Sequence, residues 1–287
     1  MVGHNGLKLR MMLAGSILFG FYAMVAAAVM WWFGASTGIL ALLLVGSVLF
    51  VGFQYKFGKW MALRSVGAED MPEQARNRYN FGEIHRSTEQ ICDEMGIEKP
   101  RLMVADMGVP NAFAVGRKGA GVVVLSTEII QLLDRDELEG VIAHELAHIK
   151  NRDVVIMVLG QSIASIVGIV VQWAYIFGGD RNIASYIVGM LLGTVAQMIV
   201  MIFVMAISRY REYVADEDAA TYTNNPDAMA RALEKISSGA QGQEMKGEET
   251  VNALCIFGTS GSFLRKIFST HPPTEERIGR LRSMSRY

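Results

Sequence analysis

The longest stretch without Asp, Glu, Lys or Arg covers residues 11–55, which is 45 residues. A helix that crosses a bilayer needs about 20 apolar residues, so this stretch is long enough for two crossings. The small and polar residues of GASTG, residues 34–38, are typical of a turn between two such helices. A cleaved signal peptide does not explain the stretch, because its apolar region has only about 7–15 residues.

Two further uncharged stretches, residues 154–179 and 182–208, are separated only by Asp180 and Arg181. They predict a second pair of membrane-crossing helices joined by a short turn. Buried helices of a soluble protein are a poor explanation, because the average helix there has only about 11–12 residues. We therefore predict a mainly α-helical membrane protein of the α+β type with four transmembrane helices.

Basic residues lie at the outer ends of both helix pairs, and the two short turns hold only Arg181. Lysine and arginine concentrate on the cytoplasmic side of membrane proteins. Both termini and the polar segments are therefore expected in the cytoplasm, in a multi-pass protein of the inner (cytoplasmic) membrane. The residues that carry this prediction are Lys8, Arg10, Lys56, Lys59, Arg64, Lys150, Arg152, Arg209 and Arg211.

The polar remainder of the chain is expected to form one cytoplasmic domain that the second helix pair interrupts. Residues 122–125 are a β-branched run followed by Ser-Thr, which predicts a short strand and then a helix cap. The glycine-rich segment 239–250 predicts a mobile loop, which could act as a lid. The predicted parts are a transmembrane hairpin (1–55), the first part of the domain (56–153), a second hairpin (154–208) and the second part of the domain (209–287).

The composition gives no support for a nucleic-acid-binding protein or for a disulfide-rich one. Hydrophobic residues make up 51% and charged residues 19%, below the soluble average of about 25%. The net charge of -1 gives no reason to expect a nucleic-acid partner. Cys92 and Cys255 are the only cysteines, so a disulfide framework and a cysteine-based metal motif are not expected.

The segment VIAHELAHIKNRD, residues 141–153, predicts a metal site on a helix. His144 and His148 are four residues apart, so their imidazoles lie on one helix face and can share one ion. Glu145 is one step round the helix, where it can take a proton from an attacking water molecule. This is the H-E-x-x-H pattern of zinc hydrolases.

The motif helix is expected to begin at Arg135, because Asp134 and Glu137 have the spacing of a capping box. Apolar residues such as Leu138 and Val141 form a stripe, and charged residues lie elsewhere. The helix is therefore predicted to be amphipathic, with its histidines at the membrane surface rather than deep inside the bilayer.

A catalytic zinc ion needs a third protein ligand, which must come from the second part of the domain. The helix of the fourth span is expected to continue into SRYREYVADEDAA, residues 208–220. Glu212 and Asp216 share a face there, so Glu212 could bind zinc and Asp216 could accept an N–H from a ligating imidazole. Glu217 and Asp218 are competing carboxylates on other faces.

These motifs resemble those of the HtpX-type membrane zinc metalloproteases of bacteria and archaea, relatives of the CAAX prenyl proteases. The resemblance covers nearly the whole chain, through PNAFAVG, LSTEIIQLLDRDELEGVIAHELAHIKNRD, SRYREYVADEDAA and STHPPTEERIGRL. It implies a cytoplasmic, gluzincin-like protease domain with a small β-sheet and one Zn²⁺ per chain. It also implies that Glu212 is the third ligand and that Asp216 supports the site.

The same resemblance implies roles for three residues that spacing does not single out. Asn111 resembles a substrate-binding asparagine beside an edge strand that aligns the peptide. His271 and Arg277 resemble a pair that points into the cleft, where His271 would stabilise the oxyanion and Arg277 would bind substrate. From the residues alone, His271 before two prolines could equally cap a helix.

The implied activity is that of a zinc metalloendopeptidase (EC 3.4.24-type) in membrane-protein quality control and the stress response. Its expected partners are membrane-protein or peptide substrates, the lipid bilayer and other membrane quality-control proteases. The alternatives are a processing protease for prenylated or other membrane-anchored peptides and a non-catalytic zinc-binding scaffold. An intramembrane protease is disfavoured, because the chain has no L-D-G segment for a third ligand.

Overall fold

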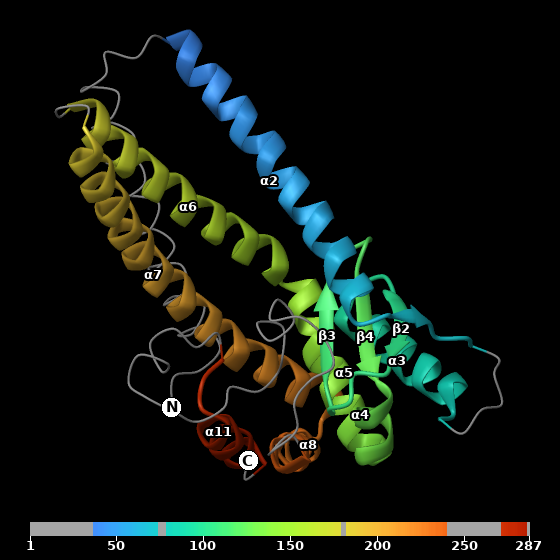
Figure 1. Ribbon diagram of the computed structural model, residues 1–287. Helices are drawn as coiled ribbons and strands as arrows, with labels where there is room; N and C mark the ends of the chain where they lie inside the picture. Colours follow the sequence, from blue (N-terminus) through green and yellow to red (C-terminus); the bar gives the residue numbers. More distant parts are fainter. Residues whose placement is uncertain (1–36, 74–78, 179–181, 240–270, 286–287) are drawn as a thin grey trace. The chain divides into compact units, whose positions relative to one another are not determined.

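The computed structural model describes residues 37–73, 79–178, 182–239 and 271–285 (Figure 1). The predicted first span, the turn at 180–181, nearly all of the proposed lid and Cys255 lie outside these residues. The chain divides into two compact units, described separately below. The first comprises residues 1–56, 156–210 and 262–268, and the second comprises residues 57–155, 211–261 and 269–287.

The described elements are nearly all helical, with one small sheet (Figure 1). The helices are α2 (Thr37–Ser65), α3 (Phe81–Met95), α4 (Thr127–Leu132), α5 (Arg135–Lys150), α6 (Asp153–Gly178), α7 (Ile183–Thr223), α8 (Pro226–Gly239) and α11 (Thr274–Met284). The strands are β1 (Glu69–Asp70), β2 (Arg101–Ala105), β3 (Ala112–Val115) and β4 (Val122–Ser126).

Two helices of the first unit, α6 and α7, are long and apolar enough to cross a membrane. Large apolar side chains are exposed along them, including Ile169, Ile183 and Leu191. Residues 37–55 of the first uncharged stretch also lie in one helix, α2. The structure therefore agrees with two of the four predicted spans by length and composition, and the four-span count stays a prediction.

Helices α6 and α7 pack closely within the first unit because glycines face each other. A Cβ atom added to Gly193 would lie 2.5 Å from the carbonyl oxygen of Gly168. Only a residue without a side chain permits this approach, as at the small-residue contacts of other membrane helices.

The sheet of the second unit has the strand order β1-β2-β4-β3. Strands β2 and β4 are parallel, whereas β3 is antiparallel to β4 and forms one edge. The strand predicted at residues 122–125 is confirmed as β4. Ser126 then caps α4, because its Oγ accepts a hydrogen bond from the N–H of Ile129 at 3.0 Å.

Helix α5 lies at the centre of the second unit and packs against α3, α8 and the sheet (Figure 1). It begins with the predicted capping box of Asp134 and Glu137. The predicted amphipathic character is confirmed in part, because Asp136 is exposed and Lys150 is half-buried, whereas every residue from 140 to 147 is buried. Even Glu137 is buried, and its carboxylate pairs with Lys235 of α8 at 2.6 Å. The histidines therefore lie inside a folded domain.

Candidate metal centre

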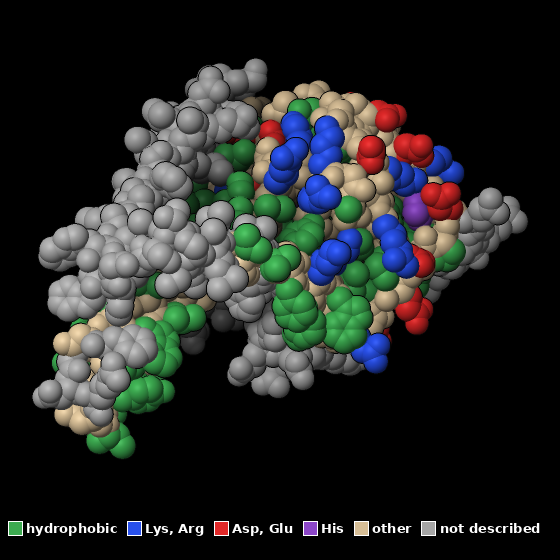
Figure 2. Space-filling model, turned by 90° about the horizontal axis from the view of Figure 1, so that it is seen from above, with side chains coloured by type: hydrophobic (Ala, Val, Ile, Leu, Met, Phe, Trp, Pro, Cys, Tyr) green, Lys and Arg blue, Asp and Glu red, His purple; other side chains and the backbone are tan. Residues whose placement is uncertain are grey.

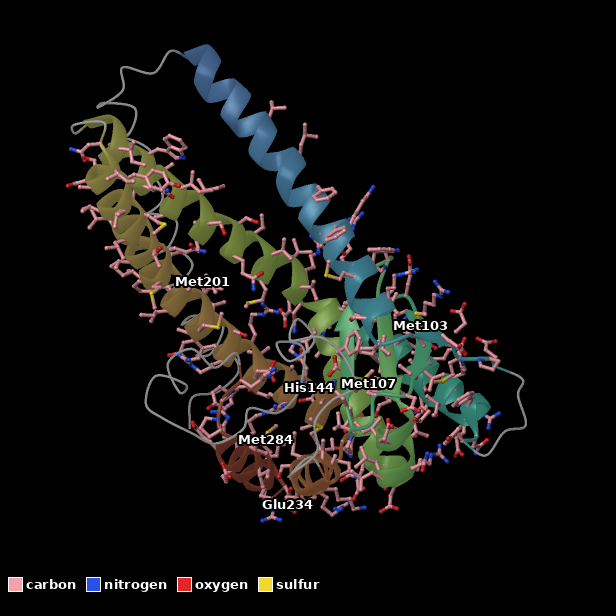
Figure 3. All side chains as sticks on the ribbon, in the orientation of Figure 1. Met103, Met107, His144, Met201, Glu234 and Met284 are labelled. Atoms are coloured by element: carbon pink, nitrogen blue, oxygen red, sulfur yellow. The ribbon has the colours of Figure 1, made fainter. Side chains whose placement is uncertain are left out.

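The two histidines of α5 direct their Nε2 atoms to the same point. These atoms lie 3.2 Å apart, and the rings of His144 and His148 meet edge to face. His144 is 1% exposed and His148 is 14% exposed by side chain, so solvent reaches the pair from the His148 side. Figure 3 shows His144 among the side chains of the second unit.

Helix α7 brings Glu212 to the two imidazoles. Its Oε2 lies 3.6 Å from Nε2 of His144, and its Oε1 lies 3.4 Å from Nε2 of His148. The three residues form a group that could hold a metal ion. The competing carboxylate of Asp218 instead accepts a hydrogen bond from Asn151 at 3.1 Å.

The spacing of these ligand atoms fits a tetrahedral zinc ion. Ligands about 2.0–2.1 Å from zinc lie about 3.3 Å from one another in that geometry. Here the two Nε2 atoms lie 3.2 Å apart, and each has a different oxygen of Glu212 near it, at 3.6 Å for His144 and 3.4 Å for His148. Two imidazole nitrogens and one carboxylate also match a donor set of catalytic zinc sites, which leave one position open.

Asp216 lies where the sequence predicts it, with Oδ1 at 3.0 Å from Nδ1 of His144. Arg277 of α11 donates two hydrogen bonds to this carboxylate, at 2.7 and 2.8 Å. Its Nη1 also lies 3.2 Å from Oε2 of Glu212. Arg277 is 1% exposed, so the expected substrate contact does not match its position. Its guanidinium is instead occupied in holding two carboxylates of the site.

The other predicted site residues have different surroundings. Nδ1 of His271 lies 2.9 Å from Oε2 of Glu212, so this histidine joins the group. Glu145 is buried beside His144 on α5. Asn111 is buried at the start of β3, where its N–H donates to Oγ of Ser126 at 3.0 Å. A substrate contact by Asn111 therefore requires a movement that exposes it, and its role stays a prediction.

Charge pairing outweighs burial at Asp216 and Glu212, which lie beyond the predicted span 182–208. Burial alone would raise the pKa of Asp216, but the charge and hydrogen bonds of Arg277 lower it to about 2. Burial would also raise the pKa of Glu212, and the charges of His271 and Arg277 instead hold it well below its usual value. The group therefore keeps two carboxylates ionised in the protein interior.

The pKa of the His144 imidazole shifts in the opposite direction, upward. Burial alone would lower its pKa, but hydrogen bonds to Asp216 and Glu212 outweigh burial and raise it. Burial alone would also lower the pKa of the Arg277 guanidinium, but the two carboxylates, Asp216 and Glu212, raise it above its usual value. Both pKa shifts have the same cause, the ionised carboxylates of Asp216 and Glu212.

Two residues at this site were missed by sequence reasoning. Asp153, the first residue of α6, has Oδ2 at 2.7 Å from Nδ1 of His148. Nε of Arg211 lies 2.8 Å from the other oxygen of Asp153. The sequence does hold a signal for this pair, because Asp153 is the first residue of an apolar helix. An acidic residue in that position costs free energy unless a counter-charge lies near it.

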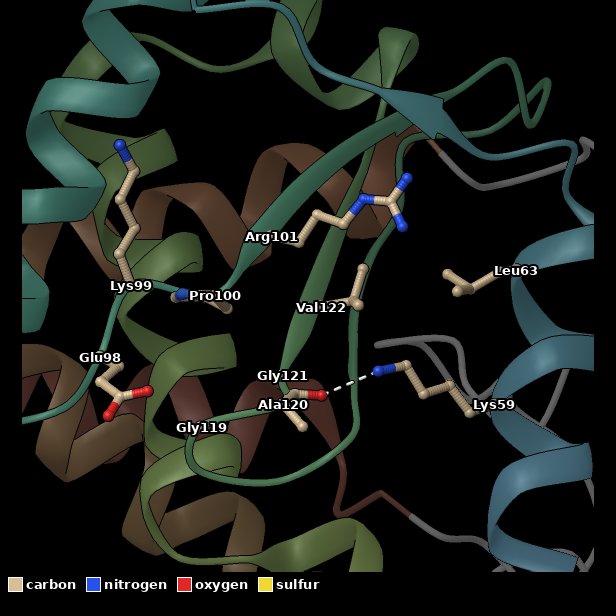
Figure 4. Close-up of a pocket in the computed structure, with 10 residues that line it drawn as sticks. All are labelled: Lys59, Leu63, Glu98, Lys99, Pro100, Arg101, Gly119, Ala120, Gly121 and Val122. Carbon is tan, nitrogen blue, oxygen red and sulfur yellow. Dashed lines mark hydrogen bonds between the residues drawn. The ribbon is translucent and has the colours of Figure 1, made fainter.

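A separate cavity of about 330 Å³ lies between the end of α2 and the turn before β4 (Figure 4). Its lining includes Lys59, Glu98 and Arg101, and Nζ of Lys59 donates to the carbonyl of Ala120 at 2.8 Å. Figure 2 shows lysine and arginine side chains beside apolar ones on the face seen from above. The lining holds none of the metal-site residues.

Comparison with known proteins places this chain in one family. The model of peptidase family M48 matches residues 78–285. A protease HtpX homolog of Halobacterium salinarum is 53% identical over 294 residues, which cover 95% of this chain and all of that protein. A protease HtpX homolog of Pyrococcus furiosus is 38% identical over 238 residues, 79% of this chain and 78% of the relative.

The crystal structure of S. mikatae Ste24p has a similar fold, with a TM-score of 0.54 and 17% identity. The match covers 96% of this chain and 66% of that structure. The fold and the His-His-Glu group define a protein of the metallopeptidase class. The chain belongs to peptidase family M48. Family membership supports a protease, and the apolar helices together with the relatives support a membrane protein.

Proposed function

We propose that this chain is a membrane-embedded zinc endopeptidase that hydrolyses peptide bonds of misfolded or damaged membrane proteins. The observation that carries the proposal is the convergence of His144, His148 and Glu212, with ligand atoms within 4.8 Å of one another, beside Glu145, in a chain of family M48. A scaffold with a structural metal has no need for an acid-base residue at that position.

Zinc bound by the three residues would supply Lewis acidity for peptide hydrolysis. Glu145 would accept the proton of the attacking water and pass it to the leaving amine. His271 would donate to the oxygen of the scissile carbonyl as negative charge develops there. Asp216 and Arg277 would hold His144 and Glu212 in place without contacting the substrate.

The substrate would be an extended segment added to the edge of the sheet at β3. An added strand is read mainly through its backbone, which suits cleavage of many different sequences. Among the described strands, β3 pairs on one side only, with β4. Asn111 immediately precedes β3 and would contact the substrate after a local opening.

The proposed setting is the inner membrane, with four spans and with both termini and the metal centre in the cytoplasm. The exposed apolar side chains of α6 and α7 support a lipid environment, and the flanking basic residues support the orientation. In this setting other quality-control proteases of the membrane would act beside it.

The test compares the wild type with Glu145→Gln, which preserves size and removes the base. Purified protein in detergent is analysed for bound zinc and then incubated with casein. We expect one zinc ion per chain in both proteins and cleavage by the wild type alone. Equal cleavage by both proteins, with zinc bound, would rule out the mechanism.

The substrate class is tested by using the Glu145→Gln protein as a trap. Membrane proteomes are compared between cells that make the active enzyme and cells that make the trap. Enrichment of misfolded membrane proteins on the trap supports quality control. Enrichment of a single lipid-anchored peptide would instead indicate a processing protease.

A further inference from the structure

Two residues, Asn151 and Arg152, connect the motif helix α5 to α6, the first apolar helix of the second hairpin. Helix α5 ends at Lys150, and Arg152 adopts a left-handed conformation with φ of 58°. This conformation is uncommon for a residue other than glycine and marks a position that its surroundings enforce. It turns Asp153, at the head of α6, back toward His148.

Asp153 is 2% exposed and contacts His148 with one oxygen and Arg211 with the other. Arg211 is itself 5% exposed. A buried carboxylate and a buried guanidinium are both costly unless each neutralises the other. Each of these two buried charges thus has the other as a counter-charge at 2.8 Å.

A similar arrangement holds the other histidine. Asp216 lies against Nδ1 of His144 and accepts two hydrogen bonds from Arg277. Asp153 lies against Nδ1 of His148 and forms an ion pair with Arg211. The two carboxylates come from α7 and α6, whereas both histidines come from α5. Each histidine thus has its own carboxylate and its own arginine.

We propose that Asp153 and Arg211 are positioning residues for His148. The Asp153 carboxylate keeps a proton on Nδ1, so that the Nε2 lone pair points at the metal position. Arg211 fixes the carboxylate from the far side. Because Arg211 immediately precedes Glu212, the same contact also ties the third ligand to the start of α6. This inference rests on the zinc site of the proposed function.

The test measures zinc affinity in the full-length protein in detergent, by competition with a chromophoric chelator. Asp153→Ala is expected to weaken zinc binding by about 10–100-fold, as loss of a partner to a ligating histidine does elsewhere. Asp153→Asn keeps an acceptor oxygen and is expected to lose less affinity. The absorption spectrum of the Co²⁺-loaded protein should change in Asp153→Ala, because the orientation of one imidazole changes.

The matched control is Asp218→Ala, which removes another buried carboxylate at the same junction. Asp218 binds Asn151 and belongs to neither histidine set, so its loss should leave zinc affinity within about twofold. Asp153→Ala leaves Arg211 without its counter-charge and could fail to fold. If Asp153→Ala does not fold, zinc affinity is measured in the double variant Asp153→Ala/Arg211→Met, which removes both charges together.

Wild-type zinc affinity in a folded Asp153→Ala protein, or in the folded double variant, overturns the inference. A weakening as large in Asp218→Ala as in Asp153→Ala also overturns it, because the effect would then be a general loss of structure. Failure of the wild type to bind zinc at all contradicts the proposed function, so the two failures are distinguishable.

Discussion

At the scale of single residues, Arg277 is the main counter-charge in the interior of the metal centre. It binds Asp216 through two hydrogen bonds and lies within 3.2 Å of Glu212. Without it, two buried carboxylates would face each other when no ion is bound. Charge balance at the centre is thus shared between the protein and the cation it is built to hold.

We therefore expect Arg277→Met to destabilise the zinc-free protein by about 3–5 kcal/mol, the cost of breaking a buried ion pair. Zinc should recover more stability in this variant than in the wild type, because the ion replaces part of the lost charge. Thermal unfolding in detergent, with and without zinc, measures both effects.

Arg282→Met is the control on the same helix. Its partner is Glu234 on the surface, and such exposed pairs contribute about 0–1 kcal/mol. Equal melting temperatures for Arg277→Met and the wild type would contradict the role assigned to Arg277.

Cys92 gives a prediction that depends on pH. Burial raises the pKa of its thiol to about 11, so the reactive thiolate is scarce at pH 8. In a Cys255→Ser background, Cys92 should react with iodoacetamide far more slowly in the native protein than in urea. Native and denatured rates that coincide at pH 8 would show that the thiol is accessible.

At the scale of elements, α5 depends on its close approach to α8. A Cβ atom added to Gly140 would lie 3.3 Å from Cα of Met229, closer than an ordinary contact. The approach matters for the site, because Gly140 is one turn before His144. Spacing between these two helices therefore sets the position of a metal ligand.

Gly140→Val should cost about 1–3 kcal/mol, the usual effect of excess volume in a packed interior, and should lower zinc affinity. Gly279→Ala on α11 is the control, because a Cβ there meets nothing within 4 Å. That change should be neutral or stabilising by about 0.5–1 kcal/mol. Zinc titration and thermal unfolding of both variants check the expectation.

Parts of the site could be predicted from the sequence because helical spacing is local. His144 and His148 share a face of α5, and Glu212 and Asp216 share a face of α7, as their four-residue separations require. Asp153 escaped prediction because its contact depends on the left-handed turn at Arg152. The burial of Arg277 depends on how α11 packs against α8, and the spacing of residues in the sequence does not predict which helices pack together.

At the scale of the whole molecule, the orientation in the membrane is open to a direct experiment. Cysteine reporters introduced by Asp180→Cys and Lys235→Cys should label from opposite sides of the membrane. The reason is that the basic residues beside the predicted spans favour the cytoplasm, whereas the predicted turn at 180–181 holds only one basic residue, Arg181. Intact cells treated with a membrane-impermeant reagent should label the first reporter and spare the second. Labelling of both from outside would contradict the predicted topology.

The metal centre combines three distant segments of the chain, and this arrangement bears on when activity can appear. His144 and Arg277 are 133 residues apart, and the helices α6 and α7 are made between them. Synthesis proceeds from the N-terminus, so the two histidines emerge well before Glu212 and Arg277 exist. We therefore expect the nascent chain to be inactive until both apolar helices have been made. On this expectation, the order of synthesis delays the proposed protease activity until the predicted membrane part is complete.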